Sequence, residues 1–227
     1  MKGLVEKTET NAVFLVIKHY SLCEESKTEK PGFAAIKVTN PRTGDQSTKF
    51  IKRYKGVEAF VRKLEWRDVS YEDQRYMSWK IHLDAAGTPC VLEIPFDSTV
   101  SSRFMKLAEN IDFTKPVEFT AWKSADDKTA FAVKQDGKNV AQKYTREDPG
   151  DCPPPVQNRT GKWNFDAQTD YLYDRMINVV IPKVDAAAAI RGELQTADNG
   201  NGDHDQGTGE PEFDQTQPEF IDDDPPF

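Results

Sequence analysis

Residues 75–94, with the sequence RYMSWKIHLDAAGTPCVLEI, decide the fold that we expect for this chain. At the start of this stretch apolar and polar residues alternate, which is the pattern of a half-buried β-strand. Trp79 falls on the apolar face of the strand, and Tyr76 and Lys80 fall on the opposite face. The turn-forming sequence at 84–87 then leads into a second apolar run. The stretch therefore predicts an antiparallel hairpin with Trp79 in the core.

Similar short strands are expected along most of the body of the chain. Residues 40–45, Asn-Pro-Arg-Thr-Gly-Asp, separate two alternating runs and predict a further hairpin turn. Residues 57–69 also fit the apolar spacing of a helix, but their β-branched and aromatic residues favour a strand. The predicted strands are Ala12 to Tyr20, Phe33 to Thr39, Ser47 to Arg53, Val57 to Val69, Tyr76 to Leu83, Pro89 to Ile94, Val117 to Lys123, Ala130 to Gln135 and Asn139 to Tyr144.

One helix is expected to interrupt these strands, with Ser98 or Ser101 as its N-terminal cap. Its apolar stripe has i, i+3, i+4, i+7 spacing and consists of Phe104, Leu107, Ala108 and Ile111. Many short strands around one helix are typical of a small closed antiparallel barrel. We therefore expect a mainly β domain over residues 1–145, with the oligonucleotide-binding barrel (OB-fold) as the leading candidate.

A helical extension is expected over residues 146–191. Its first part, 146–164, is Pro-rich and predicts irregular structure, and Asp166 is placed to cap a helix that follows. Pro182 should kink or end that helix, because a proline inside a helix costs about 3 kcal/mol. A second short helix through the alanines at 186–189 would follow.

The charge of the chain is concentrated at one end. Residues 192–227 contain 11 Asp and Glu and no Lys or Arg, out of 38 acidic and 30 basic residues in all. The remaining 27 acidic and 30 basic residues give residues 1–191 a net charge of about +3. The low hydrophobicity of 192–227 predicts a disordered acidic tail. The basic body is compatible with a nucleic-acid ligand, which the overall charge of −8 would argue against.

Basic and aromatic residues alternate along the body, a mixture that suits single-stranded nucleic acid. Cations follow the phosphates, and exposed rings stack on bases whatever their identity. The competing interpretation is that the rings belong to the core and the lysines to a solvated face. The candidate contacts with single-stranded DNA are Lys18, Lys37, Lys49, Lys52, Arg53, Tyr54, Lys55, Arg62, Trp66, Arg67, Tyr71, Arg75, Tyr76, Lys80 and Lys123.

Signals for catalysis are weak, and we expect no enzyme activity and no cofactor. The three histidines stand singly, and no Gly-rich phosphate loop or hydrolase motif occurs. The main alternative is a magnesium-dependent nuclease that uses Asp166, Asp170 and Asp174, which would share one helical face. Such a row is more often a solvated face.

Cysteine usage and hydropathy point to a cytoplasmic protein. Cys23, Cys90 and Cys152 are odd in number and far apart, which suits free thiols and disfavours a structural zinc site. The polar residues 1–11 do not have the pattern of a signal peptide, and no apolar run approaches the length of a membrane span.

The last six residues, Asp222-Asp223-Asp224-Pro225-Pro226-Phe227, form an acidic, non-helical end with one apolar point. Such an end suits capture by another protein, with the ring in a pocket and the carboxylates on Lys or Arg. It resembles the acidic tip of bacterial and phage single-stranded DNA-binding proteins. The body is also similar, at residues 54–57 and 79–84, to β-rich domains found in phage and mobile elements of gut bacteria.

The resemblance implies a sequence-independent binder of single-stranded DNA in replication, repair or recombination. Its tip, Asp222 to Asp224 with Pro225, Pro226 and Phe227, would recruit replication proteins such as a polymerase, helicase or primase. The physical argument adds that an acidic tethered tail would compete with DNA for a basic groove. A third alternative is an adaptor or DNA mimic that binds proteins only. The oligomeric state is left open, with a homo-oligomer as one option.

Overall fold

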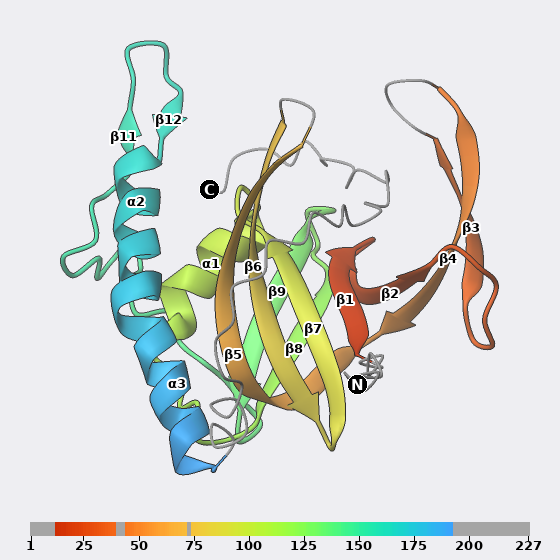
Figure 1. Cartoon of the computed structure of the whole chain (residues 1–227). Helices are drawn as coiled ribbons and strands as arrows, with labels where there is room; N and C mark the ends of the chain where they lie inside the picture. Colours follow the sequence, from red (N-terminus) through yellow and green to blue (C-terminus); the bar gives the residue numbers. More distant parts are fainter. Residues whose placement is uncertain (1–11, 40–43, 72–73, 193–227) are drawn as a thin grey trace, which may run out of the picture.

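The computed structural model describes residues 12–39, 44–71 and 74–192. They form a mainly β structure in which helices cover one face of a large sheet (Figure 1). The elements are β1 Val13–Lys18, β2 Ser21–Ser26, β3 Ala34–Thr39, β4 Gln46–Tyr54, β5 Gly56–Tyr71, β6 Gln74–Ala85, β7 Thr88–Pro95, α1 Thr99–Ala108, β8 Val117–Lys123, β9 Thr129–Gln135, β10 Lys138–Asn139, β11 Val156–Gln157, β12 Trp163–Asn164, α2 Asp166–Arg175, the π-helical turn η1 Met176–Val180 and α3 Ile181–Ile190.

The main sheet is mixed and open, with the strand order β10-β9-β8-β5-β6-β7-β1-β2-β4-β3. The expected closed antiparallel barrel is not formed among the described residues, because β10 and β3 lie at the two ends of this order. In addition, β1 runs parallel to β7. Hydrophobic alternation specifies which face of a strand is buried but not which strand lies beside it, so this pairing was not predictable from pattern.

The hairpin expected at 75–94 is confirmed as β6 and β7, with Ala85 opposite Thr88 across a two-residue turn. Ala86 and Gly87 in that turn have φ of 50° and 86°. The long strand favoured over a helix is confirmed as β5, which pairs with β6 from Phe60 to Tyr71. Trp79 is completely buried, as predicted.

Two strand predictions were wrong in extent. The expected strand from Ala12 to Tyr20 reverses after Lys18, and the unpredicted β2 follows it. Of the expected strand at 139–144, only Asn139 lies in a strand, as the second residue of β10. The Tyr144 side chain is instead buried against the helical layer, where its hydroxyl donates to the Glu109 carboxylate.

The helix over 99–108 is confirmed as α1, and the Ser98 hydroxyl caps it by accepting a hydrogen bond from the Ser101 amide at 3.1 Å. Asp166 is the first residue of α2 and not its cap, and its amide donates to the Asn164 side-chain oxygen.

Pro182 does not end the C-terminal helix. The turn η1 lies just before it, and the Ile181 amide donates to the Met176 oxygen with π-helical spacing. Pro182 then lies in the first turn of α3, where a missing N–H is tolerated. The local π turn therefore lets one helical run pass through the proline.

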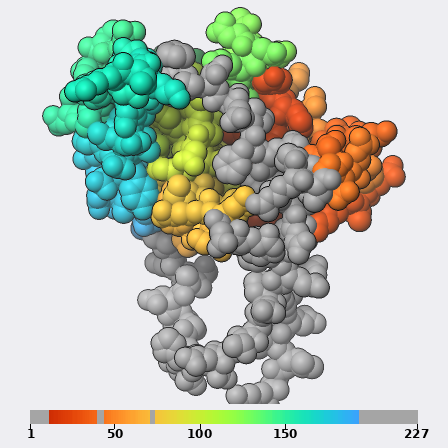
Figure 2. Space-filling view, turned by 90° about the horizontal axis from the view of Figure 1, so that it is seen from above, coloured from red at the N-terminus to blue at the C-terminus, as the bar shows by residue number. Residues whose placement is uncertain are grey.

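The C-terminal helices share one core with the sheet. Buried residues of α2, η1 and α3 pack in the same cluster as Trp79, Phe104 and Phe119. The ribbon of β3 and β4, which we call the arm, extends away from this body (Figure 1). The arm and the helical layer lie at opposite ends of the molecule in the space-filling view (Figure 2).

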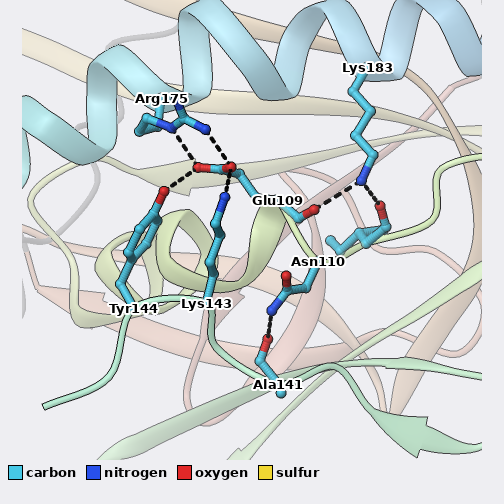
Figure 3. Close-up of polar contacts among 8 residues, drawn as sticks. Glu109, Asn110, Ala141, Lys143, Tyr144, Arg175 and Lys183 are labelled. Carbon is cyan, nitrogen blue, oxygen red and sulfur yellow. Dashed lines mark hydrogen bonds and ion pairs between the residues drawn. The ribbon is translucent and has the colours of Figure 1, made fainter. Parts of the chain in front are cut away.

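Glu109, at the end of α1, contacts α2, α3 and the loop segment at 143–144 (Figure 3). Its carboxylate accepts two hydrogen bonds from Arg175, both at 2.7 Å, and one from the Tyr144 hydroxyl at 2.5 Å. Lys143 forms an ion pair with the same carboxylate, and Lys183 donates to the Glu109 carbonyl oxygen. The Arg175 hydrogen bonds, against the opposing effect of burial, lower the pKa of Glu109 to about 2. We call this set of contacts the Glu109 lock.

No helix in the described part of the chain has both the length and the apolar character needed to cross a membrane.

Candidate nucleic-acid interface

Three strand ends that are far apart in sequence surround an open groove of about 590 Å³. The turn between β1 and β2 forms one wall, the junction of β4 and β5 forms the second, and the end of β8 forms the third. The lining residues are His19, Tyr20, Ser21, Arg53, Tyr54, Lys55, Ala121, Trp122 and Lys123. The groove thus combines cationic and aromatic side chains, and none of its described lining residues carries a carboxylate.

The cations of the groove differ in how they are held. Arg53 and Lys55 are exposed, and neither forms an ion pair within the residues that the structure describes. Lys123 pairs with Asp127, and its ammonium lies over the Tyr20 ring at 5.2 Å from the centroid. Tyr20 also donates to Asp127, at 3.1 Å, so this corner of the groove is fixed. Among the described residues, two of the three cations are thus without an ion pair, and the third helps to shape the wall.

Trp122 is more exposed than the two tyrosine rings of the groove, with 45% of its surface accessible. It lies opposite the small residue Ala130 in the β8–β9 pairing, beyond the last residue of β8 that pairs with β5. Within the described residues no other ring stacks on it. A partly exposed indole of this kind can stack on a base.

Tyr54 is held more tightly, because its hydroxyl donates to Glu24 at 2.9 Å and Lys52 lies over its ring at 5.1 Å. Burial, and then the hydrogen bond to Glu24, raise the pKa of the Tyr54 phenol. The ring is thereby fixed in orientation at the groove wall, with its hydroxyl kept neutral.

The turn between β1 and β2 has an unusual backbone. Lys18 and Ser21 are opposite each other in the hairpin, which leaves only His19 and Tyr20 in the loop. Both have positive φ, 49° and 61°, as the favoured type I′ turn requires. Asn-Gly is the usual sequence there, and a left-handed conformation costs other residues about 1 kcal/mol or more each. The turn therefore carries two ring side chains into the groove at the expense of local stability.

Gly56 lets the second and third walls approach. A Cβ atom at this position would lie 2.9 Å from Thr120 Cγ2 and 3.0 Å from the Phe119 carbonyl oxygen. Only glycine avoids this clash, so β5 can start directly against β8. Lys55, one residue earlier, is thereby brought to the same groove as Trp122.

The structure brings together four of the predicted DNA contacts, Arg53, Tyr54, Lys55 and Lys123, with Lys52 beside Tyr54. Other predicted contacts lie elsewhere. Lys18 and Lys49 both pair with Glu25, at 2.8 and 3.7 Å, and Lys37 is exposed on β3.

The arginines among the predicted contacts on β5 and β6 form ion pairs with carboxylates. Arg62 pairs with Asp84, Arg75 with Asp68 at 2.5 Å, and Arg67 with Glu93 at 3.8 Å. Tyr71 is the last residue of β5. Tyr76 hydrogen-bonds to Gln74, and Lys80 lies opposite Glu65 and Glu93 on the neighbouring strands. Their neighbourhood is therefore less favourable to phosphate than the groove.

Trp66 lies in an aromatic cluster at the boundary of the core. Its ring centroid is 4.9 Å from that of Trp79, 4.8 Å from Phe96 and 5.1 Å from Tyr173. Much of the ring surface is thus occupied by protein. Its stacking on DNA stays a prediction.

Sequence reasoning missed five lining residues of the groove, and three of them carry rings: His19, Tyr20 and Trp122. The available signals were the polar pair His-Tyr inside an apolar run and the Trp-Lys pair at the end of a strand.

The residues of the magnesium alternative do not come together. Asp166, Asp170 and Asp174 are all exposed on α2, and no group of acidic, histidine or cysteine residues that could hold a metal ion occurs in the ranges described above. The tail and the tip from Asp222 to Phe227 lie outside the described residues. Comparisons of this chain with protein-family models, with curated proteins and with solved structures found no match.

Proposed function

We propose that the protein binds single-stranded DNA without sequence preference, and that the groove at the β4–β5 junction holds the strand. The observation that supports this proposal is that an exposed indole and two cations without an ion pair among the described residues line one groove. The open sheet would then serve the purpose that an oligonucleotide-binding barrel serves in other proteins.

Each part of the groove has a distinct role in the proposal. Arg53 and Lys55 bind successive phosphates, since charge attraction supplies most of the affinity in non-specific binding. Trp122 stacks on a base, which contributes about 1–3 kcal/mol for any base. The groove is an open surface and not an enclosed pocket, which suits a continuous strand better than a single nucleotide.

The backbone of the β1–β2 turn supports a ligand role for His19 and Tyr20. Positive φ at non-glycine residues is concentrated at functional sites, where the role of the side chain outweighs the energetic cost of the backbone strain. A turn needed only for the fold would be more stable with Asn and Gly.

The acidic tail completes the proposal. Its net charge of −11 is opposite in sign to the groove, and its tether keeps it at high effective concentration. We propose that it competes with DNA, and that Asp222, Asp223, Asp224 and Phe227 dock replication proteins once DNA has displaced it. The protein then acts as a non-catalytic binder and recruiter in replication, repair or recombination.

The test is fluorescence anisotropy of labelled oligo(dT) with the full chain at low salt. Arg53→Ala/Lys55→Ala should weaken binding about tenfold or more and reduce the slope of log affinity against log salt by about 1.4, or about 0.7 for each lost phosphate contact. Arg103→Ala/Lys138→Ala is the matched control, because it removes two exposed cations from α1 and β10.

Two results would overturn the proposal. One is a full chain that ignores oligo(dT) at low salt even when Asp222 to Asp224 are changed to Asn, which would favour the protein-only adaptor. The other is a groove variant that binds as well as the control variant.

A further inference from the structure

The hairpin of β11 and β12 is an exposed projection that the fold itself does not use. All residues from Val156 to Asn164 are exposed, including Val156 at 64% and Trp163 at 40%. Figure 1 shows the hairpin beyond the N-terminal end of α2, away from the main sheet. None of its side chains belongs to the hydrophobic core.

The hairpin nevertheless contains several internal hydrogen bonds. The Asn158 side-chain oxygen accepts from the Thr160 amide, the Thr160 hydroxyl and the Lys162 amide, at 3.0, 2.7 and 2.9 Å. Gln157 donates to the Gly161 carbonyl oxygen at 2.8 Å, and Gly161 has the positive φ of 82° that this tip requires. Ordering exposed backbone costs about 1 kcal/mol or more per residue, with no apolar burial to offset it. An ordered hairpin outside the core is therefore suited to holding side chains in place for a ligand.

The chemistry of these side chains selects an anionic ligand with flat apolar groups. From Cys152 to Phe165 the chain has two cations, Arg159 and Lys162, and no Asp or Glu. Neither cation forms an ion pair within the described portion of the chain. Trp163 stands beside them, and no other described ring stacks on it. Phosphates and bases together match this set, whereas a purely apolar or a cationic partner does not.

We infer that the β11–β12 hairpin is a second contact for the same single strand, with Arg159 and Lys162 on phosphates and Trp163 on a base. This inference rests on the proposed function of the groove and extends it. The groove lies where the arm joins the body, and the hairpin lies at the far end of the molecule from the arm (Figures 1 and 2). On this arrangement we expect a long strand to contact both sites and a short one to contact only one of them.

The experiment compares two lengths of labelled oligo(dT) with the full chain: about 8 nucleotides, which is within the site size of one groove, and about 40 nucleotides. Arg159→Ala/Lys162→Ala should weaken binding of the long oligonucleotide about tenfold, reduce its salt slope by about 1.4 and leave the short one unchanged. Trp163→Ala should weaken the long oligonucleotide by a similar factor, and Trp163→Phe should restore most of the loss because it keeps a stacking ring.

The outcomes separate this inference from the proposed function. If the groove variant loses both lengths while the hairpin variants match Arg103→Ala/Lys138→Ala, the groove binds DNA and the hairpin inference is wrong. If the unmodified chain binds neither length, both proposals fail. If the hairpin variants lose a protein partner but keep full affinity for the long oligonucleotide, the hairpin is a protein contact and the inference is overturned.

Discussion

Neutralising the buried carboxylate of the Glu109 lock should destabilise the protein by about 3 kcal/mol at neutral pH. Glu109→Gln keeps the size of the side chain but removes the charge that Arg175 and Lys143 face. The folded-state pKa is about 2, against an ordinary value of 4.5. A difference of about 2.5 pH units corresponds to about 3 kcal/mol, at about 1.36 kcal/mol per unit. The carboxylate side chain is only 5% exposed, so solvent screening reduces this figure little.

The pH dependence has a definite sign. Because folding lowers this pKa, the charged carboxylate stabilises the fold fully above about pH 4.5, and the contribution is lost as the pH falls toward 2. Urea unfolding of both proteins between pH 7 and pH 2.5 measures it. The difference in unfolding free energy should be about 3 kcal/mol at pH 7 and should shrink steadily below pH 4.5.

Glu118→Gln is the matched control, because Glu118 pairs with Lys134 at 3.4 Å on the surface and is 39% exposed. Exposed pairs contribute about 0–1 kcal/mol. The reasoning about the lock is refuted if Glu109→Gln costs no more than this control at pH 7. It is also refuted if the difference between Glu109→Gln and the unmodified protein stays constant down to pH 2.5.

Three further substitutions test other parts of the structure. His19→Asn/Tyr20→Gly should raise the unfolding free energy by about 1 kcal/mol, since it relieves two left-handed residues, and should weaken oligo(dT) binding; a variant that gains stability and keeps affinity would remove the ligand role of the turn. Gly56→Ala should cost about 1–3 kcal/mol by thermal or urea unfolding, because its Cβ would press on β8, and an unchanged stability would contradict the close approach. Trp66→Leu should cost about 2–4 kcal/mol and leave oligo(dT) affinity unchanged, whereas a selective loss of affinity would show that this ring stacks on DNA after all.

The local pattern of apolar, turn-forming and capping residues was enough to predict most strands and α1. The alternation around Trp79, the turn sequence at 84–87 and the Ser98 cap each act within a few residues, so the sequence expresses them directly. The β1–β2 reversal was missed because His19 and Tyr20 have no turn preference. The π turn before Pro182 was missed because nothing in its sequence marks it.

The groove was only half predictable, for a different reason. Arg53, Tyr54 and Lys55 are consecutive, and their basic and aromatic character is visible in the chain. Trp122 reaches them only through the pairing of β5 with β8, a contact between residues far apart in sequence. The parallel pairing of β1 with β7 is equally non-local. Periodicity carries no information about such partners, and this is also why an open sheet was mistaken for a barrel.

The close succession of β4 and β5 has a mechanical consequence. Lys55 alone separates the strand that belongs to the arm from the strand that belongs to the body. A swing of the arm about this junction would be expected to move Lys55 relative to Trp122. A strand bound in the groove would resist that swing, and by reciprocity an arm held by a neighbour would change the affinity for the strand. On the proposed function, ligand occupancy and arm orientation would be coupled, and slower amide exchange in β3 on addition of oligo(dT) would report that coupling.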